Sequence, residues 1–319
     1  MHPLLTTLGS RLAERWLNLL VLPGALYLGA AAAGTTLGHA HWHDIDRLRT
    51  ALDDFAARPA ADRPGTAALL VAAALLLATA ASLAAQFLGG TIERYWLRTA
   101  RDPASYALVK RRGRRWDRRE HERLDAVRRH AEAALRRPRQ DDSAVRPGDD
   151  ELVVQPGQLA EIRARTAARD RIAALRPVRP TWYGDRMEAA AERVHDAYGV
   201  DLAALWPRLW LILTEPAQRQ IQTARDSFSV SARLAAWAVG YGLLAVWWWP
   251  SALVAIGCAL TARTRARDSV ASLAELMEAA VDVHGRELAA LVGLITADSP
   301  GRLDRDTGDR LSELFRKAG

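Results

Sequence analysis

The chain has one cysteine and only two lysines among its 319 residues. A single thiol, Cys258, cannot form an intrachain bridge, so the sequence excludes a secreted domain held together by disulfides. The basic charge is almost entirely arginine, with 44 Lys and Arg residues against 37 Asp and Glu residues. Because such a bias follows genomic base composition more than phosphate chemistry, the net charge of +7 indicates little by itself about a partner.

Three long stretches lack charge altogether. No Asp, Glu, Lys or Arg occurs from Trp16 to His43, from Pro64 to Ile92 or from Leu234 to Ala262, and each run is 28 or 29 residues long. About 20 helical residues, at 1.5 Å each, cross the roughly 30 Å of hydrocarbon in a bilayer. Buried helices of a large soluble core are the alternative, but they rarely need so many consecutive uncharged residues. The runs predict an all-α, polytopic membrane protein.

The third run contains Trp247-Trp248-Trp249-Pro250 at its middle. Proline ends a helix, and indoles favour the headgroup level of a bilayer. We therefore expect a hairpin of two spans of roughly 18 residues each, with the Arg233 side chain extending toward an interface. One long span kinked at the proline is the alternative.

Basic residues near the span ends predict the orientation. By the positive-inside rule, both termini and the long middle segment lie in the cytoplasm of a cell (inner) membrane protein. A cleaved signal peptide is the competing interpretation of the N-terminus, although its apolar run exceeds the usual 7–15 residues. The predicted order is the N-terminus and first span 1–36, an extracytoplasmic loop 37–65, a second span 66–92, a cytoplasmic helical domain 93–230 with a flexible linker near 138–157, a hairpin of two spans 231–265, and cytoplasmic C-terminal helices 266–319.

An arginine-rich helix is predicted within the cytoplasmic domain. One apolar stripe runs along it, and the other faces carry arginine interleaved with acidic residues. Arginine clusters beside a membrane commonly attract anionic lipids, and a solvated charged face is the equal alternative. Nucleic-acid binding is disfavoured, because no recognised nucleic-acid-binding motif accompanies these arginines. The stripe is Trp116, Leu124, Val127, Ala131 and Leu135, and the candidate lipid contacts are Arg111, Arg112, Arg114, Arg115, Arg118 and Arg119.

The segment 180–210 has the densest structural signals. Gly184 suits a turn, Asp185 is expected to cap the helix that follows, Gly199 to end that helix, and Asp201 to cap the next one. The aromatic residues nearby are expected to form a core, with a binding surface as the alternative. The candidate structural and interaction residues are Trp182, Tyr183, Gly184, Asp185, Tyr198, Asp201, Trp206 and Arg208.

Three further helices are expected around this domain. One runs from Gln158 to about Leu175, and another begins at Glu215 and continues into the third uncharged run. A third follows Arg267, carries apolar residues near heptad spacing, and either packs on the domain or pairs with a second copy.

Motifs in this part of the chain resemble a group of uncharacterised multispanning membrane proteins from actinobacteria and related bacteria. They are Pro-Thr-x-x-Gly-Asp at 180–185, Tyr-Gly-x-Asp at 198–201 and Trp-Pro-Arg-Leu at 206–209. The resemblance implies membrane residence and a cytoplasmic domain between two pairs of spans. It implies no activity, so it assigns no catalytic residue.

Candidate chemistry is sparse. His39, His41 and His43 would hold a metal ion only if the segment were extended. We expect instead that they mark where the first span leaves the bilayer, and we predict no catalytic residue and no cofactor. The spans carry no charge that would mark an ion path, and the small residues from Ala78 to Ala85 favour helix association.

These features predict a non-enzymatic, self-associating membrane interaction or scaffold protein. An oligomeric channel or transporter is the first alternative, and a membrane-bound metal- or lipid-dependent enzyme is the second.

Overall fold

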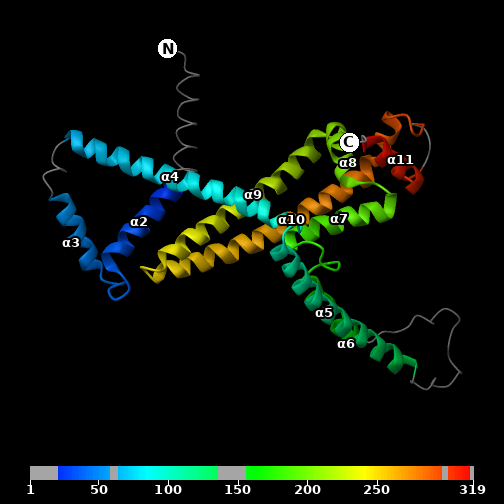
Figure 1. The fold of residues 1–319 in the computed structure, drawn as a ribbon, viewed down its shortest axis with the longest axis horizontal. Coiled ribbons are helices and arrows are strands. Elements are labelled where there is room, and N and C mark those ends of the chain that lie inside the picture. Colours follow the sequence, from blue (N-terminus) through cyan, green and yellow to red (C-terminus); the bar gives the residue numbers. More distant parts are fainter. Residues whose placement is uncertain (1–20, 58–63, 136–155, 297–300, 317–319) are drawn as a thin grey trace, which may run out of the picture. The chain divides into compact units, whose positions relative to one another are not determined.

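The computed structural model describes residues 21–57, 64–135, 156–296 and 301–316. Within these ranges the chain forms ten helices, α2 to α11, and no strand (Figure 1), which confirms the predicted all-α fold. The helices fall into two compact units, Met1–Tyr95 with Gln222–Ser269, and Trp96–Ile221 with Val270–Gly319. Nearly all of the predicted linker near 138–157 lies outside the described residues, as does the start of the first predicted span.

The first unit contains α2 (Leu22–Leu37), α3 (Ile45–Ala56) and most of α4 (Pro64–Trp96). In the part of the chain that the structure describes, α4 is the one helix long and apolar enough to cross a membrane. The four predicted spans are therefore not established by the structure. The predicted extracytoplasmic loop holds α3, a short amphipathic helix.

Two different faces run along α4. One face is buried and consists of small side chains, Ala78, Ser82 and Ala85, which recur at intervals of four and three residues. A Cβ atom on Gly24 of α2 would lie 1.9 Å from the carbonyl oxygen of Ala78, so the two backbones cross in close contact. The opposite face is apolar and uncovered: Leu76 and Phe87 are 71% and 75% exposed.

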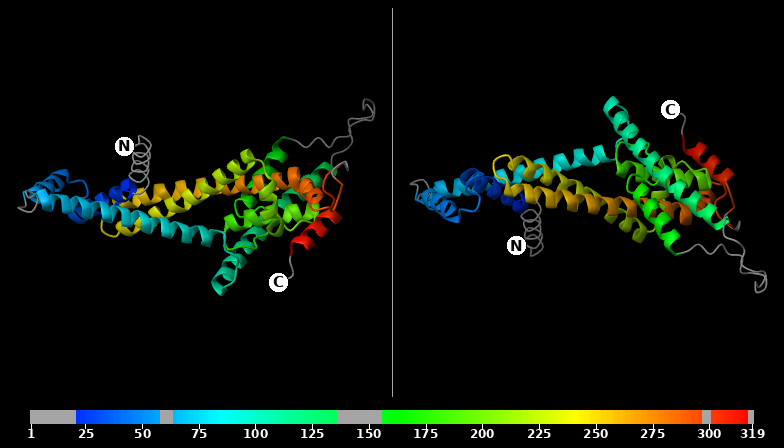
Figure 2. Two further views of the ribbon diagram at one scale, coloured as in Figure 1. Left: turned by 90° about the horizontal axis from the view of Figure 1, so that it is seen from above. Right: turned by 90° about the horizontal axis from the view of Figure 1, so that it is seen from below.

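The third uncharged run forms a helical hairpin. Helix α9 (Glu215–Leu244) begins at the predicted residue, the chain reverses at the three tryptophans, and α10 (Pro250–Leu291) returns beside it (Figure 1, Figure 2). The Ser251 hydroxyl closes the turn by donating to the carbonyl oxygens of Tyr241, at 3.1 Å, and Trp248, at 2.8 Å. The turn divides the 29-residue run between the two arms, and neither arm passes the test of length and apolarity that α4 passes among the described helices.

The second unit contains α5 (Pro103–Leu135), α6 (Pro156–Asp170), α7 (Trp182–Tyr198), α8 (Leu202–Ile212), α11 (Arg305–Phe315) and the remaining turns of α9 and α10. Its core is a single apolar cluster built from α7, α8, α9, α10 and α11. The fully buried members include Val200, Leu205, Leu209, Val281 and Leu311.

The C-terminal part of α10 shows whether the helix predicted after Arg267 packs on its own domain or is free to pair with a second copy. The helix does not begin after Arg267 but continues unbroken from Pro250 to Leu291. Its near-heptad residues Leu273, Met277 and Val281 pack in the core of the second unit. This face therefore packs on its own domain, and it is not available to pair with a second copy.

Candidate functional site

The motif at 180–185 builds the start of α7 differently from the prediction. Thr181 is the N-cap, and its hydroxyl accepts the N–H of Gly184 at 3.1 Å. Gly184 lies in the first turn of the helix, not in a loop, and Asp185 is inside the helix. The predicted cap at Asp185 is wrong because the threonine three residues before Gly184 already satisfies the exposed amide.

The Asp185 carboxylate instead holds the loop that precedes the helix. One carboxylate oxygen accepts the N–H groups of Val178, at 2.9 Å, and Arg179, at 2.7 Å, and the other lies 2.5 Å from a guanidinium nitrogen of Arg112. Burial raises the pKa of Asp185, and the Arg112 charge and the two amides partly oppose that rise. The residue is a structural anchor, since it binds two backbone N–H groups of this loop and the guanidinium of Arg112.

Helix α5 holds the same loop from the other side. Arg112 donates to the carbonyl oxygens of Ile172 and Arg179, both at 2.7 Å, and the Trp116 indole donates to that of Ala173 at 3.0 Å. Residues 171–181, named here the anchored loop, are thus tied to α5 at three carbonyls. Helix α6 ends at Asp170, earlier than the predicted Leu175, because the chain turns into this loop.

Two predicted aromatic residues lie beside the anchored loop. Tyr183 is buried and stacks on Trp96, with ring centroids 4.5 Å apart. Trp182 packs edge-on against Tyr183 and donates to the carbonyl oxygen of Asp170 at 3.4 Å. The Thr181 hydroxyl also donates to the Trp96 carbonyl, so the start of α7 is joined to the end of α4.

The second motif lies at the junction of α7 and α8. Gly199 ends α7 with φ +70°, and Asp201 caps α8 by accepting the N–H groups of Ala203 and Ala204, so both predictions are confirmed. Burial raises the pKa of Asp201, but the hydrogen bonds from Arg316 and the cap outweigh burial and lower it overall. The Tyr198 hydroxyl donates to Asp282 at 2.8 Å.

The third motif packs α8 on the core. Trp206 lies against the apolar cluster, and Arg208 donates to the Ala204 carbonyl while its guanidinium lies 4.9 Å from the ring centroid of Phe315. The predicted structural and interaction residues are therefore divided between two places, the anchored loop and the α7–α8 junction. Both places join helices of the second unit.

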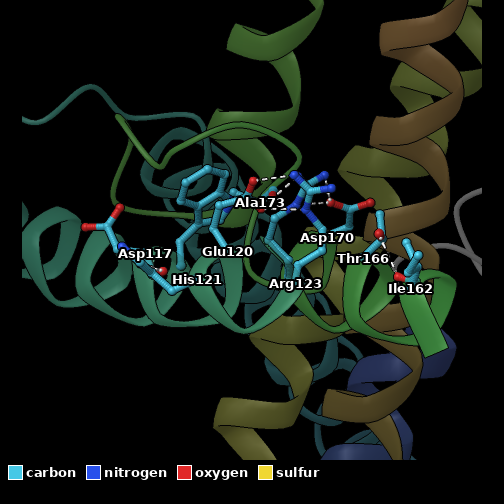
Figure 3. Close-up of polar contacts among 10 residues, drawn as sticks. Asp117, Glu120, His121, Arg123, Ile162, Thr166, Asp170 and Ala173 are labelled. Carbon is cyan, nitrogen blue, oxygen red and sulfur yellow. Dashed lines mark hydrogen bonds and ion pairs between the residues drawn. The ribbon is translucent and has the colours of Figure 1, made fainter. Parts of the chain in front are cut away.

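Ion pairs join helices α5 and α6 (Figure 3). Glu120 accepts from Arg123, at 2.9 and 2.6 Å, and from Arg169 of α6 at 3.1 Å. The hydrogen bonds from Arg123 are the largest influence on this carboxyl, and together with Arg169 they lower its pKa to about 2 against the opposing effect of burial. The predicted apolar stripe is wrong at Leu124 and Ala131, which are exposed, because ion pairs occupy the packed face instead.

The six predicted lipid-contact arginines have different environments. Arg112 points inward to Asp185, and Arg119 pairs with Glu122 at 2.8 Å. A shallow concavity of about 470 Å³ lies where α5 meets the end of α6, lined in part by Arg115 and Arg118. The inward turn of Arg112 had a sequence signal, because it lies four residues before Trp116 and thus on the buried face.

The three histidines before α3 lie in consecutive turns, not in an extended segment. His41 contacts the guanidinium of Arg47 at 3.0 Å, and the Trp42 ring packs on His43 and on Trp249 of the hairpin turn. Among the described residues, no group of three or more His, Cys, Asp or Glu side chains is placed to hold a metal ion. A shallow concavity near His41 and His43 is lined by Asp44, Asp46 and Arg49 as well.

In comparisons with protein-family models, curated proteins and solved structures, the chain matches none. The resemblance to multispanning membrane proteins stays a prediction, and function has to be argued from the site and the surface.

Proposed function

We propose that the protein is an integral membrane interaction protein without catalytic activity, which holds its second unit beside the bilayer and associates with further copies of itself. The uncovered apolar face of α4 is the observation that carries the proposal. A row of bare leucine and phenylalanine side chains in water is costly, at roughly 1.5–3 kcal/mol for each large side chain left exposed. A bilayer removes that cost without a protein partner.

The contacts within the first unit support three further membrane-inserted helices beside α4. The Tyr27 hydroxyl of α2 lies 3.5 Å from the carbonyl oxygen of Gly240 in α9, and a Cβ atom on Gly34 would lie 3.0 Å from the Cβ atom of Trp248. Residue numbers rise together in these two contacts, so α2 and α9 run in the same direction. This parallel course fits a topology in which both helices enter from the cytoplasm and the hairpin returns there.

The charge and the aromatic rings of this unit support the proposed topology. Arg233 packs against Gly89, about 6 Å of helix before Glu93 and Arg94, so its guanidinium has other charged residues within reach. The tryptophan turn lies beside Trp42, whose ring meets that of Trp249 edge-on with centroids 5.0 Å apart, and indoles favour the headgroup level. We propose four insertions with both termini in the cytoplasm.

Self-association rests on surfaces other than the α10 face, which the core already occupies. The second unit leaves Leu211 of α8 and Leu291 of α10 uncovered, at 80% and 65% exposure. Two such side chains give a second copy apolar area to cover, although single exposed leucines are common on monomers.

Membrane insertion and orientation are tested together in intact cells. The full chain should stay in the membrane pellet through alkaline carbonate extraction. In a Cys258→Ser background, a His43→Cys variant should react with a membrane-impermeant maleimide from outside, and a Glu132→Cys variant only after permeabilisation. Release by carbonate, or the opposite labelling pattern, refutes the proposed insertion or the proposed orientation.

Self-association is tested by crosslinking and light scattering on the full chain in mild detergent. We expect a species larger than a monomer, reduced by Leu211→Ser. Leu52→Ser, which changes a leucine of α3 that is 61% exposed, is the control and should leave the species unchanged. A monomer that captures no second copy contradicts the scaffold function and leaves membrane insertion intact.

A further inference from the structure

The concavity between α5 and the end of α6 is the strongest unassigned feature of the second unit. Four of its lining side chains are arginines, Arg115, Arg118 and Arg119 of α5 and Arg171 of the anchored loop. Glu122 supplies the one carboxylate, so four positive charges less one negative charge leave a formal charge of +3 around a space of about 470 Å³.

The α5 arginines are arranged to face a ligand together. Arg118 and Arg119 follow Arg115 by three and four residues. This spacing places the three side chains on neighbouring turns of one helix face. Arg119 is partly neutralised by Glu122 at 2.8 Å. In the described part of the chain, Arg115 and Arg118 are exposed and form no ion pair, so their guanidinium donors are available to an anion.

The opposite wall is held in place by contacts already described. Arg171 immediately precedes Ile172 and Ala173, whose carbonyl oxygens accept from Arg112 and Trp116. The backbone beside Arg171 is therefore fixed to the same helix that carries the other arginines. Such pre-organisation lowers the ordering cost of binding, and it distinguishes the concavity from arginines spread along a solvated helix.

We infer that this concavity binds a phosphate group. Planar guanidinium groups match phosphate oxygens in bidentate geometry, and several of them around one space favour a compact, multiply charged anion over a single carboxylate. The phosphate can belong to an anionic lipid headgroup or to a soluble phosphate compound. The inference goes beyond the proposed function, because a phosphate site stands whether or not α4 crosses a bilayer.

The test compares two double variants of the full chain in neutral detergent. Arg115→Gln with Arg118→Gln removes two charges from the concavity. Arg111→Gln with Arg114→Gln removes the same charge from exposed positions on the same helix that do not line it. Circular dichroism spectra of both variants should match that of the unchanged protein, which separates binding from folding.

Two probes distinguish the sources of phosphate. Calorimetry measures binding of pyrophosphate, and native mass spectrometry counts bound phosphatidic acid against phosphatidylcholine. For the probe that binds, we expect the concavity variant to weaken binding by at least about tenfold, since charge-assisted hydrogen bonds are lost, and the control variant by less than about twofold. If the concavity variant weakens binding of phosphatidic acid alone, the ligand is a lipid headgroup. If it weakens binding of pyrophosphate, the ligand is a soluble phosphate compound.

Three results overturn the inference. Equal weakening by the two variants shows diffuse attraction to the whole helix, which also predicts a steep loss of binding in high salt. Unchanged binding in the concavity variant places the anion elsewhere. Absence of binding of either probe to the unchanged protein removes the site.

Discussion

Replacing Arg112 by methionine tests whether the anchored loop depends on one buried guanidinium. The change keeps most of the side-chain length and removes the charge. Asp185 is then left almost fully buried without its cationic partner, and the carbonyl oxygens of Ile172 and Arg179 lose their donors. Burial already raises the pKa of Asp185, so removing the charge that opposes this effect should raise it further.

The expected loss of stability follows from the burial of the pair. Breaking a buried ion pair by removing one partner costs about 3–5 kcal/mol. The Arg112 side chain is 17% exposed and that of Asp185 is 5% exposed. Because the pair is not completely buried, we expect a loss at the lower end of this range, about 3 kcal/mol. For a unit of this size, that loss lowers the midpoint of thermal unfolding by roughly 6–12 °C.

The assay combines a global and a local measurement on the full chain in detergent. Thermal unfolding gives the midpoint, and hydrogen exchange gives the protection of amides in the anchored loop, which should fall first. Arg115→Met is the control, because it removes the same charge from an exposed position one turn away. The double variant Arg112→Met with Asp185→Asn should be more stable than Arg112→Met alone, since no buried carboxylate remains unpaired.

The reasoning is refuted if Arg112→Met lowers the midpoint no more than Arg115→Met does. It is also refuted if amides of the anchored loop keep their protection in the variant. Strict additivity in the double variant would show that the two side chains do not interact in the folded protein.

Three further predictions concern charge and close backbone contacts. The pKa of Glu120 is lowered from 4.5 to about 2, so the stability that its ionised carboxylate contributes is present above about pH 4.5 and is lost as the pH falls toward 2. Glu120→Gln should therefore lower the free energy of unfolding at pH 6 by about 1–2 kcal/mol, a value discounted for the partial solvent exposure of the pair. Urea unfolding measures this loss. Gly24→Val should separate α2 from α4, because even a Cβ atom would overlap the Ala78 carbonyl, and the melting temperature should fall. Gly308→Ala should destabilise α11, because its Cβ atom would lie 1.8 Å from the Tyr198 carbonyl oxygen, and exchange of the α11 amides should rise.

Two of these predictions have a matched control. Glu122→Gln removes a more exposed carboxylate of α5 and should change stability less than Glu120→Gln at the same pH. Gly29→Val in α2 places its side chain where no atom lies within 4 Å, and it should be tolerated. A Glu120→Gln variant whose deficit persists unchanged at pH 2, or a Gly24→Val variant as stable as Gly29→Val, contradicts the corresponding argument.

Local signals in the sequence predicted much of the second unit. Gly199 ends α7 and Asp201 caps α8 as expected, because a left-handed residue and a side-chain acceptor act within a few residues of their own position. The start of α9 at Glu215 was equally predictable. The cap of α7 was misassigned because Thr181 and Asp185 are both competent acceptors, and only the geometry of the preceding loop selects between them.

Long-range pairing could not be predicted from these local signals. The spacing to Trp116 places Arg112 on the buried face of α5, but the sequence does not reveal its partners. Asp185 and the carbonyl oxygens of Ile172 and Arg179 all lie 60 or more residues away along the chain. The interlocked face of α5 is charged where an apolar stripe was expected, since Glu120 and Arg169 satisfy each other across the two helices.

The sequence by itself determined that the fold is helical and that long uncharged segments exist, because composition and periodicity act along the chain. Tertiary structure decided how those segments are used. A turn at the tryptophans divides the third run into a hairpin, leaving α4 as the one continuous helix, among those described, with the length and apolarity to cross a bilayer. It also selected which arginines face inward, because burial and hydrogen-bond partners come from residues distant in sequence.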